Sequence, residues 1–209
     1  MLADPDTPEY PNGLPKVTPV IAGVACDGFG LGNFSLVIDH CTNSTTNEPC
    51  DIEGFPNNVE RWAGSRGAPS DEGLISFPLT NDEPPKNKLS CSVVSRGVEV
   101  LSVQAPAHDL PLTPMTVSIN NVTDTETAVM WSDDIFEFPK AYKHYSHEGD
   151  RFDGVFLGYD KTTSWAIKYT ESESGLPDAK PYYGFRLLKT GEPLREGESA
   201  TWIKVGGSF

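Results

Sequence analysis

The chain has 209 residues, enough for one good-sized domain or at most two small ones. Thirty acidic residues against 16 basic ones leave a net charge of −14. Such a surface repels nucleic-acid phosphates and anionic lipid head groups, so neither nucleic acid nor a membrane is expected as a partner. No stretch approaches the roughly 18 apolar residues that a membrane-spanning helix needs.

The N-terminal segment, residues 1–15, contains four prolines and is predicted to be an extended arm. Residues 16–209 are then predicted to form a single all-β domain, because 19 glycines and 18 prolines favour short strands and turns over long helices. Eleven apolar or alternating runs lie between turn signals and predict strands. In chain order these runs are 17–22, 34–39, 73–80, 89–94, 98–103, 115–119, 127–131, 154–159, 164–169, 182–188 and 200–205.

Two pairs of these runs predict hairpins, because turn-forming residues at 95–97 and 120–125 separate them. Two other segments, 58–61 and 139–148, carry helix signals. Asparagines precede the first, while the second begins with a proline and is followed by a glycine. Either helix would be short, and the prediction for the domain is all-β.

About 11 or 12 short strands in one domain predict a β-trefoil or a jelly-roll-like β-sandwich. The strands fall into three groups along the chain, as the three units of a trefoil do. A sandwich buries one face of each alternating strand, and the same runs satisfy that pattern as well. We prefer both to a barrel of the calycin type, and the choice between them stays open.

Four cysteines and three N-glycosylation triplets indicate a secreted protein, since disulfides persist in oxidising surroundings. We therefore expect that a signal peptide was removed. Cys41 and Cys50 are predicted to close a short polar loop, which leaves Cys26 and Cys91 as a long crosslink. The spacing contains no zinc-binding C-x₂₋₄-C pair. The triplets begin at the glycosylation acceptors Asn33, Asn43 and Asn121.

No catalytic motif, cofactor site or metal site is predicted. The H-x-x-H-E run from His144 to Glu148 matches no metalloprotease signature, and a solvated loop is the preferred interpretation. The chain contains no G-x-S-x-G elbow. The glycine-rich run 28–32 leads into a strand instead of a helix, so it is not expected to bind phosphate.

Binding residues are predicted in the polar and aromatic segment 140–153 and at a loop-like tryptophan. Proline-rich loops at 66–73, 81–86 and 172–181 would add rigid contact surface. The other tryptophans, Trp131, Trp165 and Trp202, alternate along strands and are predicted to fill the core. The predicted binding residues are Trp62, Tyr142, His144, Tyr145 and His147.

An alternative is a carbohydrate-active or glycan-binding β-sandwich. Glycoside hydrolysis uses two facing carboxylates, and Glu99, Glu137 and Glu171 lie within or next to predicted strands. Exposed aromatic side chains would serve to bind sugars in such a protein.

The run Gly191-Glu-Pro-Leu-Arg-Glu-Gly197 resembles the G-x-P-L-x-x-G run of plant Kunitz-type protease inhibitors. In this chain it lies near the C-terminus, and the cysteine spacing differs from that family. The resemblance implies a secreted β-trefoil that inhibits proteases through a loop. The acidic, four-cysteine profile is also similar to small secreted effectors of filamentous plant pathogens. We therefore predict a secreted, non-enzymatic protein that binds a partner protein, with a protease as the first candidate.

Overall fold

The computed structural model describes residues 14–22, 35–42, 46, 48–51, 56–57, 60–63, 73–78, 88–94, 98–104, 114–123, 126–132, 139–170 and 182–206. Within these ranges, side chains are described for 14–22, 36–42, 46, 48–51, 139–169 and 183–205. The side-chain arguments below concern those residues.

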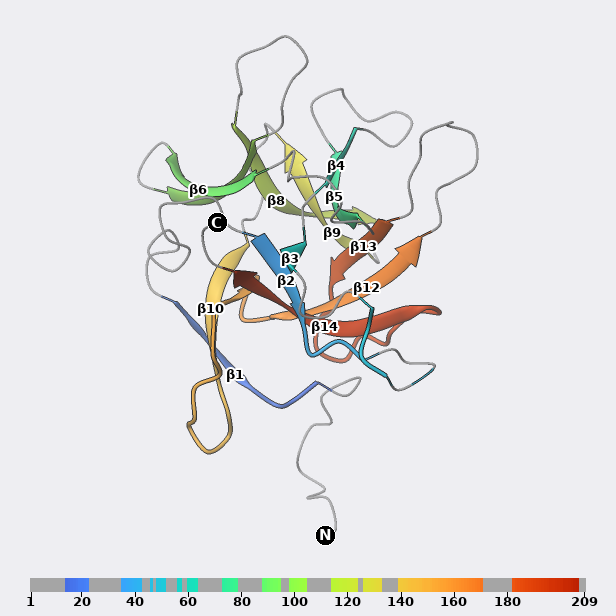
Figure 1. The fold of residues 1–209 in the computed structure, drawn as a ribbon. Helices are drawn as coiled ribbons and strands as arrows, with labels where there is room; N and C mark the ends of the chain where they lie inside the picture. The colour runs from blue at the N-terminus through green and yellow to red at the C-terminus, as the bar shows by residue number, and fades with distance from the viewer. Residues whose placement is uncertain are drawn as a thin grey trace.

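All regular elements in the described ranges are strands, which confirms the all-β prediction (Figure 1). The described chain contains no helix long and apolar enough to cross a membrane. The strands are β1 (Thr18–Ile21), β2 (Ser35–Asp39), β3 (Pro56–Asn57), β4 (Glu60–Ala63), β5 (Gly73–Pro78), β6 (Lys88–Val94), β7 (Val98–Gln104), β8 (Pro114–Thr123), β9 (Glu126–Ser132), β10 (Lys140–Tyr145), β11 (Phe156–Gly158), β12 (Ser164–Thr170), β13 (Tyr182–Leu187) and β14 (Glu198–Gly206).

Each of the eleven predicted strands has a counterpart, with differences at the ends, and β3, β4 and β10 are additional. Both predicted hairpins are confirmed, as the antiparallel pairs β6–β7 and β8–β9. In the second hairpin the strands extend to Thr123 and Glu126, so the acceptor Asn121 lies within β8 and not at the tip.

The two helix predictions are wrong. Residues 60 and 61 belong to β4, and residues 140–145 of the second predicted helix form β10. Pairing explains the second error, since β10 is hydrogen-bonded to β1 on one edge and to β11 on the other. Strand pairing and burial of the alternate side chains outweigh the weak helix-capping signals around this segment.

Strand β14 is paired along both of its edges. On one edge it pairs with β2. The other edge is shared by two strands, since Trp202 pairs with Ser164 of β12 and Lys204 pairs with Phe156 of β11. From there the sheet continues through β10 to β1, and through β12 to β13 (Figure 1).

The part of the sheet whose side chains are described is buried on both faces, and each face has its own apolar cluster. Successive residues of a strand point to opposite faces, so Trp202 and Ile203 of β14 enter different clusters. The Trp165 cluster consists of Ala22, Leu36, Ile38, Cys41, Ala141, Leu157, Trp165, Ile167, Phe185, Leu187 and Ile203. The Trp202 cluster consists of Leu14, Val17, Phe156, Ala166, Leu188, Ala200 and Trp202, with Phe152 and Leu194 packed against it. The core positions predicted for Trp165 and Trp202 are confirmed.

The N-terminal segment covers part of the Trp202 cluster. Leu14 is only 5% exposed and Val17 only 6%, so both are core residues. The predicted arm extended to residue 15, but Leu14 is already packed against the sheet. The rest of the predicted arm, residues 1–13, lies outside the described ranges.

Strand β1 is the last strand at one end of the sheet, and a proline removes a hydrogen-bond donor from its outer edge. The Ala22 N–H donates to the Ala141 carbonyl of β10. Since strand residues alternate, Val20 and Thr18 also direct their backbone groups toward β10, while Pro19 and Ile21 direct theirs outward. A further strand pairing with this edge would need an outward N–H at position 19, and proline has none.

The predicted Cys41–Cys50 disulfide is confirmed. The Cys50 N–H donates to the Cys41 carbonyl at 3.0 Å, and a bridge between Thr42 and Pro49 continues this pairing into the loop. Cys41 is buried in the Trp165 cluster, so the crosslink anchors the end of β2 to the core. Cys26 and the side chain of Cys91 lie outside the described parts, as do Asn33 and Asn43, and these assignments stay predictions.

Candidate functional site

The predicted binding residues of segment 140–153 lie on a hairpin formed by β10, the turn 146–155 and β11. The structure separates them by exposure. Tyr142 is 1% exposed and His144 is fully buried, Tyr145 is half-buried, and His147 is exposed. Tyr142 and His144 are therefore core residues and not part of a contact surface. Trp62 lies in β4, and its side chain is outside the described parts.

Strand alternation explains this separation. Tyr142 and His144 are two residues apart on β10 and share one face of the strand, whereas Lys143 and Tyr145 lie on the other face, where they are only half-buried. The two histidines lie on a strand and in a turn, not on one helix face. In the described chain no group of three His, Cys, Asp or Glu side chains could hold a metal ion.

The tip of the hairpin is ordered by its own hydrogen bonds. The Ser146 N–H donates to the Asp150 carbonyl at 2.7 Å, and the Asp150 N–H donates to Ser146 Oγ at 3.1 Å. The Gly149 N–H donates to the Ser146 carbonyl at 3.0 Å, and Gly149 has a φ of 91°, which favours glycine. This turn presents the exposed residues His147 and Glu148 on a fixed backbone.

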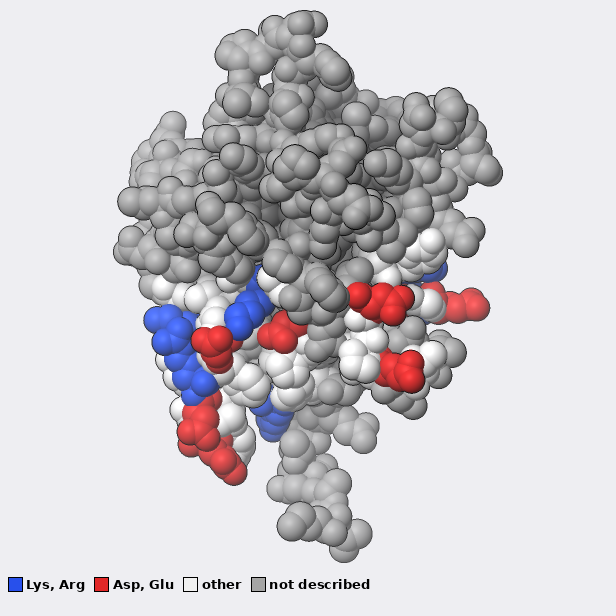
Figure 2. All heavy atoms as spheres, in the orientation of Figure 1, with Lys and Arg blue, Asp and Glu red and all other residues white. Residues whose placement is uncertain are grey.

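Charges of both signs lie along the hairpin. Figure 2 shows acidic side chains at its tip and basic ones nearer its base. The exposed acidic residues of the turn are Glu148, Asp150 and Asp153. Lys204 Nζ lies 3.2 Å from Asp153 Oδ2, an exposed ion pair of the kind that contributes little to stability. The tip is thus polar and accessible, with no buried charge to hold a substrate.

His144 is held between aromatic rings beneath this hairpin. Its ring stacks on Phe156 at a centroid distance of 3.9 Å and meets Trp202 edge-on at 4.6 Å. Its Nε2 lies 2.8 Å from Thr163 Oγ1, and its Nδ1 has no hydrogen-bond partner. Burial, reinforced by electrostatic repulsion from nearby His40, lowers the pKa of His144 to about 3. The ring is therefore neutral at physiological pH.

Tyr142 likewise has a structural role. Its hydroxyl oxygen accepts a hydrogen bond from the Lys161 N–H at 3.1 Å. Burial raises the pKa of this phenol, so it stays protonated. The contact supports the turn between β11 and β12, where Asp160 and Lys161 both have positive φ.

A second exposed loop joins β13 to β14 and carries the G-x-P-L-x-x-G run. Residues Lys189–Gly191 and Glu196–Gly197 are exposed, whereas Leu194 packs against the Trp202 cluster. The loop folds back at once, because the Glu192 N–H donates to the Lys189 carbonyl at 3.0 Å. Gly191, with a φ of 84°, completes this turn.

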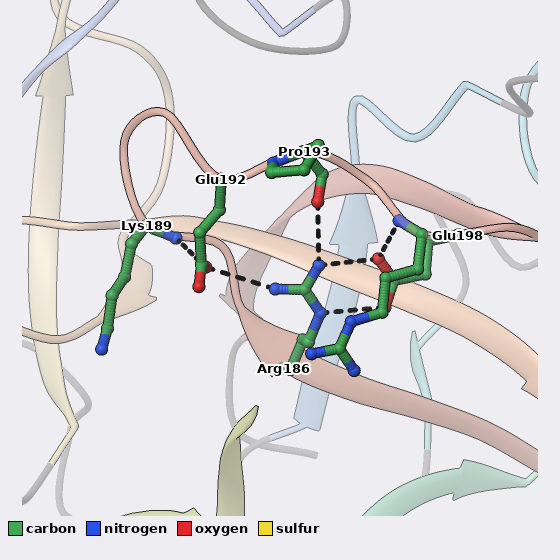
Figure 3. Close-up of polar contacts among 6 residues, drawn as sticks. Arg186, Lys189, Glu192, Pro193 and Glu198 are labelled. Atoms are coloured by element: carbon green, nitrogen blue, oxygen red, sulfur yellow. Dashed lines mark hydrogen bonds and ion pairs between the residues drawn. The ribbon is translucent and has the colours of Figure 1, made fainter. Parts of the chain in front are cut away.

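A buried arginine holds the loop from below (Figure 3). Arg186 of β13 donates from Nε and Nη2 to the two carboxylate oxygens of Glu198, at 2.9 and 2.8 Å. Its Nη2 also donates to the Pro193 carbonyl at 3.2 Å, and its Nη1 to Glu192 Oε2 at 3.3 Å. One guanidinium therefore contacts the middle of the loop and the strand that follows it.

Backbone contacts complete this network. The Lys189 N–H donates to Glu192 Oε2 at 3.0 Å, and the Arg195 N–H donates to Glu198 Oε2 at 2.8 Å. Burial acts to raise the pKa of Glu198, but hydrogen bonds from Arg186 and from the Arg195 N–H outweigh it, so the pKa is lowered. The hydrogen bond with Glu198 raises the pKa of Arg186 against the opposing effect of burial. Both groups are thus charged.

Sequence reasoning missed Arg186 and Glu198. They are twelve residues apart on neighbouring segments, and no short motif connects them. The only sequence signal was the glycine-bounded run between them, which marked the loop but not its anchor.

The hairpin turn and the β13–β14 loop rest on the same core. Phe152 from the hairpin and Leu194 from the loop both pack against the Trp202 cluster. We call residues 146–151 and 189–197 the two loops. They are polar and fixed in position, which suits recognition. Of the carboxylates considered for glycoside hydrolysis, Glu137, Glu171 and the side chain of Glu99 lie outside the described parts.

The chain matches none of the protein-family models searched, and no curated protein is significantly similar to it.

Proposed function

We propose that this is a secreted, non-enzymatic binding protein of the effector or inhibitor type, which engages a partner protein through rigid exposed loops. The observation that carries the proposal is the buried Arg186, which holds the β13–β14 loop at Glu192, Pro193 and Glu198. A protease is the class of partner to test first.

Rigidity is the physical reason. A loop that must be ordered on binding loses conformational entropy, and this loss subtracts from affinity. The β13–β14 loop is already ordered by one guanidinium, two carboxylates and the packing of Leu194. Its exposed polar residues, including Lys189 and Glu196, would therefore meet a partner without first becoming ordered.

The proposal includes the scaffold around the loops. We take the all-β domain to be a β-trefoil or a β-sandwich, with Cys26–Cys91 as a second crosslink. Secretion would make Asn33, Asn43 and Asn121 glycan acceptors. The confirmed Cys41–Cys50 disulfide supports an oxidising location.

Protease inhibition tests the function directly. Equimolar protein is incubated with a panel of papain-like and serine proteases, and residual peptide hydrolysis is measured. We expect stoichiometric inhibition of at least one protease. Reversing the loop charges with Lys189→Glu and Glu196→Lys should weaken the inhibition by at least about tenfold, because the centre of a protein interface dominates its binding energy.

The matched control reverses two exposed charges outside the loops, Asp51→Lys and Lys161→Glu, and preserves net charge in the same way. It should change inhibition by less than about twofold. Equal losses in both variants would exclude the loops as the contact surface. Release of reducing sugar from a polysaccharide panel, with no protease inhibited, would refute a non-enzymatic role and favour the carbohydrate-active alternative.

A further inference from the structure

Strand β1 is attached to the described sheet along one edge only. It is hydrogen-bonded to β10 alone, and the side chains of Val20 and Ile21 are 46% and 50% exposed. Three side chains of the surrounding segment add to this attachment: Leu14 and Val17 pack into the Trp202 cluster, and Ala22 packs into the Trp165 cluster. Elements with few buried contacts are the first to open locally.

His144 lies directly beneath this attachment. In the β1–β10 register it is the residue opposite Pro19, two positions after Val17. Its ring contacts Phe156 and Trp202, two members of the cluster that Leu14 and Val17 cover. Removing Leu14–Ala22 from β10 would expose this ring to water, whereas in the closed state its Nδ1 is buried and has no partner.

The surroundings favour the neutral ring while β1 is in place. The side chains around the His144 ring carry no charge: they are Phe156 on β11, Trp202 on β14, Thr163 and Pro19. His40, directly after β2, is a titratable group on this side. Its ring lies 4.6 Å from Trp202, and its Nδ1 is 2.9 Å from the Asp39 carboxylate. A protonated His40 would repel a second proton on His144.

We propose that His144 is an acid-sensitive latch for the N-terminal segment: proton uptake at its buried imidazole releases Leu14–Ala22 from β10 while the rest of the sheet stays folded. The proton binds the open state, in which the ring is hydrated, and the closed state excludes it. Acid therefore shifts the population toward the open state by linkage. This device acts in the free protein and does not depend on what the loops bind.

The uptake of one proton sets how strongly the opening of β1 should depend on pH. A hydrated histidine has a pKa near 6.5, and the pKa of His144 in the closed state is about 3. The equilibrium constant for opening should then rise on the order of 100-fold between pH 7.5 and pH 4.5. The rise begins below pH 6.5, because the open state takes up its proton there, and it ends near the closed-state pKa.

Amide hydrogen exchange at several pH values, corrected for the intrinsic exchange rate, tests the latch. The Ala22 amide, bonded to the Ala141 carbonyl, reports the release of the segment. The Ile167 amide lies between β13 and β14 and reports global unfolding. We expect Ala22 to lose protection about 100-fold by pH 4.5 while Ile167 stays protected. Equal loss at both amides, or none at Ala22, would overturn the proposal.

Two variants separate His144 from the other titrating groups. His144→Phe keeps an aromatic ring but takes up no proton, so protection at Ala22 should become independent of pH over this range. His147→Gln removes the exposed histidine of the same hairpin and should keep the full response. Should His144→Phe not fold, a ring-proton NMR titration of wild-type His144 decides. The latch requires the ring to stay neutral well below pH 6.5 while β1 is in place, and a ring that takes up its proton near pH 6.5 with Ala22 still protected refutes it.

Discussion

At the scale of single residues, the described core is unusual for the polar groups that it buries. Arg186 and Glu198 are only 7% and 5% exposed, and His144 is fully buried. The first two neutralise each other through a bidentate contact, which is the geometry in which a buried ion pair is tolerated. His144 instead remains uncharged. Charge pairing and neutrality are the two ways in which an ionisable group can be kept inside a protein.

Mutations of Arg186 and Glu198 should have strongly non-additive effects on the free energy of unfolding. Arg186→Met should destabilise the fold by about 3–5 kcal/mol, because it leaves the Glu198 carboxylate buried without its partner. The double variant Arg186→Met with Glu198→Leu should recover most of this loss, since two apolar side chains need no partner. Urea unfolding of the single and double variants measures both effects. A double variant as unstable as the sum of the singles would contradict the coupling.

At the scale of elements, β10 and β1 show how pairing decides secondary structure. Segment 140–145 carries signals for a helix, but two neighbouring strands supply its hydrogen bonds and it becomes β10. Strand β1 has only four residues, and Pro19 removes a donor from its outer edge. An exposed edge without such protection is a template for pairing with another chain.

Replacing Pro19 should change the association state of the protein. Pro19→Thr restores an outward N–H on β1, next to the exposed Val20 and Ile21. We expect this variant to self-associate at concentrations where the wild type does not, as measured by sedimentation velocity. Thr18→Val is the matched control, because the backbone of Thr18 already faces β10 and offers no new donor outward. Self-association of the control alone would show that the edge does not control association.

At the scale of the whole molecule, strands from the N-terminal and C-terminal parts of the chain pair in one sheet. Strand β2 pairs with β14, from Asp39 opposite Trp202 to Ser35 opposite Gly206, and Thr201 Oγ1 donates to the Asp39 carbonyl at 2.9 Å. Such contacts join residues more than 160 positions apart, so they form late and at a high entropic cost. The Cys41–Cys50 disulfide anchors the end of β2 on which this pairing depends.

The Cys41–Cys50 disulfide should contribute measurably to the free energy of unfolding. Cys41→Ser with Cys50→Ser should lower the free energy of unfolding by about 2.7 kcal/mol, because a disulfide with a sequence separation of 9 restricts the unfolded chain by roughly that amount. Urea unfolding under non-reducing conditions measures the loss. Glu48→Gln, an exposed change in the same loop, is the control and should be close to neutral. A loss below about 1 kcal/mol would show that the restriction of the unfolded chain is not what the disulfide contributes.

The sequence by itself determined the all-β class, the eleven strand runs, both hairpins and the Cys41–Cys50 pair. These features depend on local patterns: alternation with a period of two, turn residues between runs, and a short cysteine spacing. For the predicted binding residues, the sequence could not tell the buried Tyr142 and His144 from the exposed His147.

Only the tertiary structure decided which faces are buried and which distant groups meet. Both faces are covered in the part of the sheet whose side chains are described, so alternation alone could not show which residues of β10 are exposed. The contact of Arg186 with Glu198 and the stacking of His144 on Phe156 join residues from different strands. Such contacts depend on strand order and register, which are set by the sum of many long-range pairings and leave no local mark in the sequence.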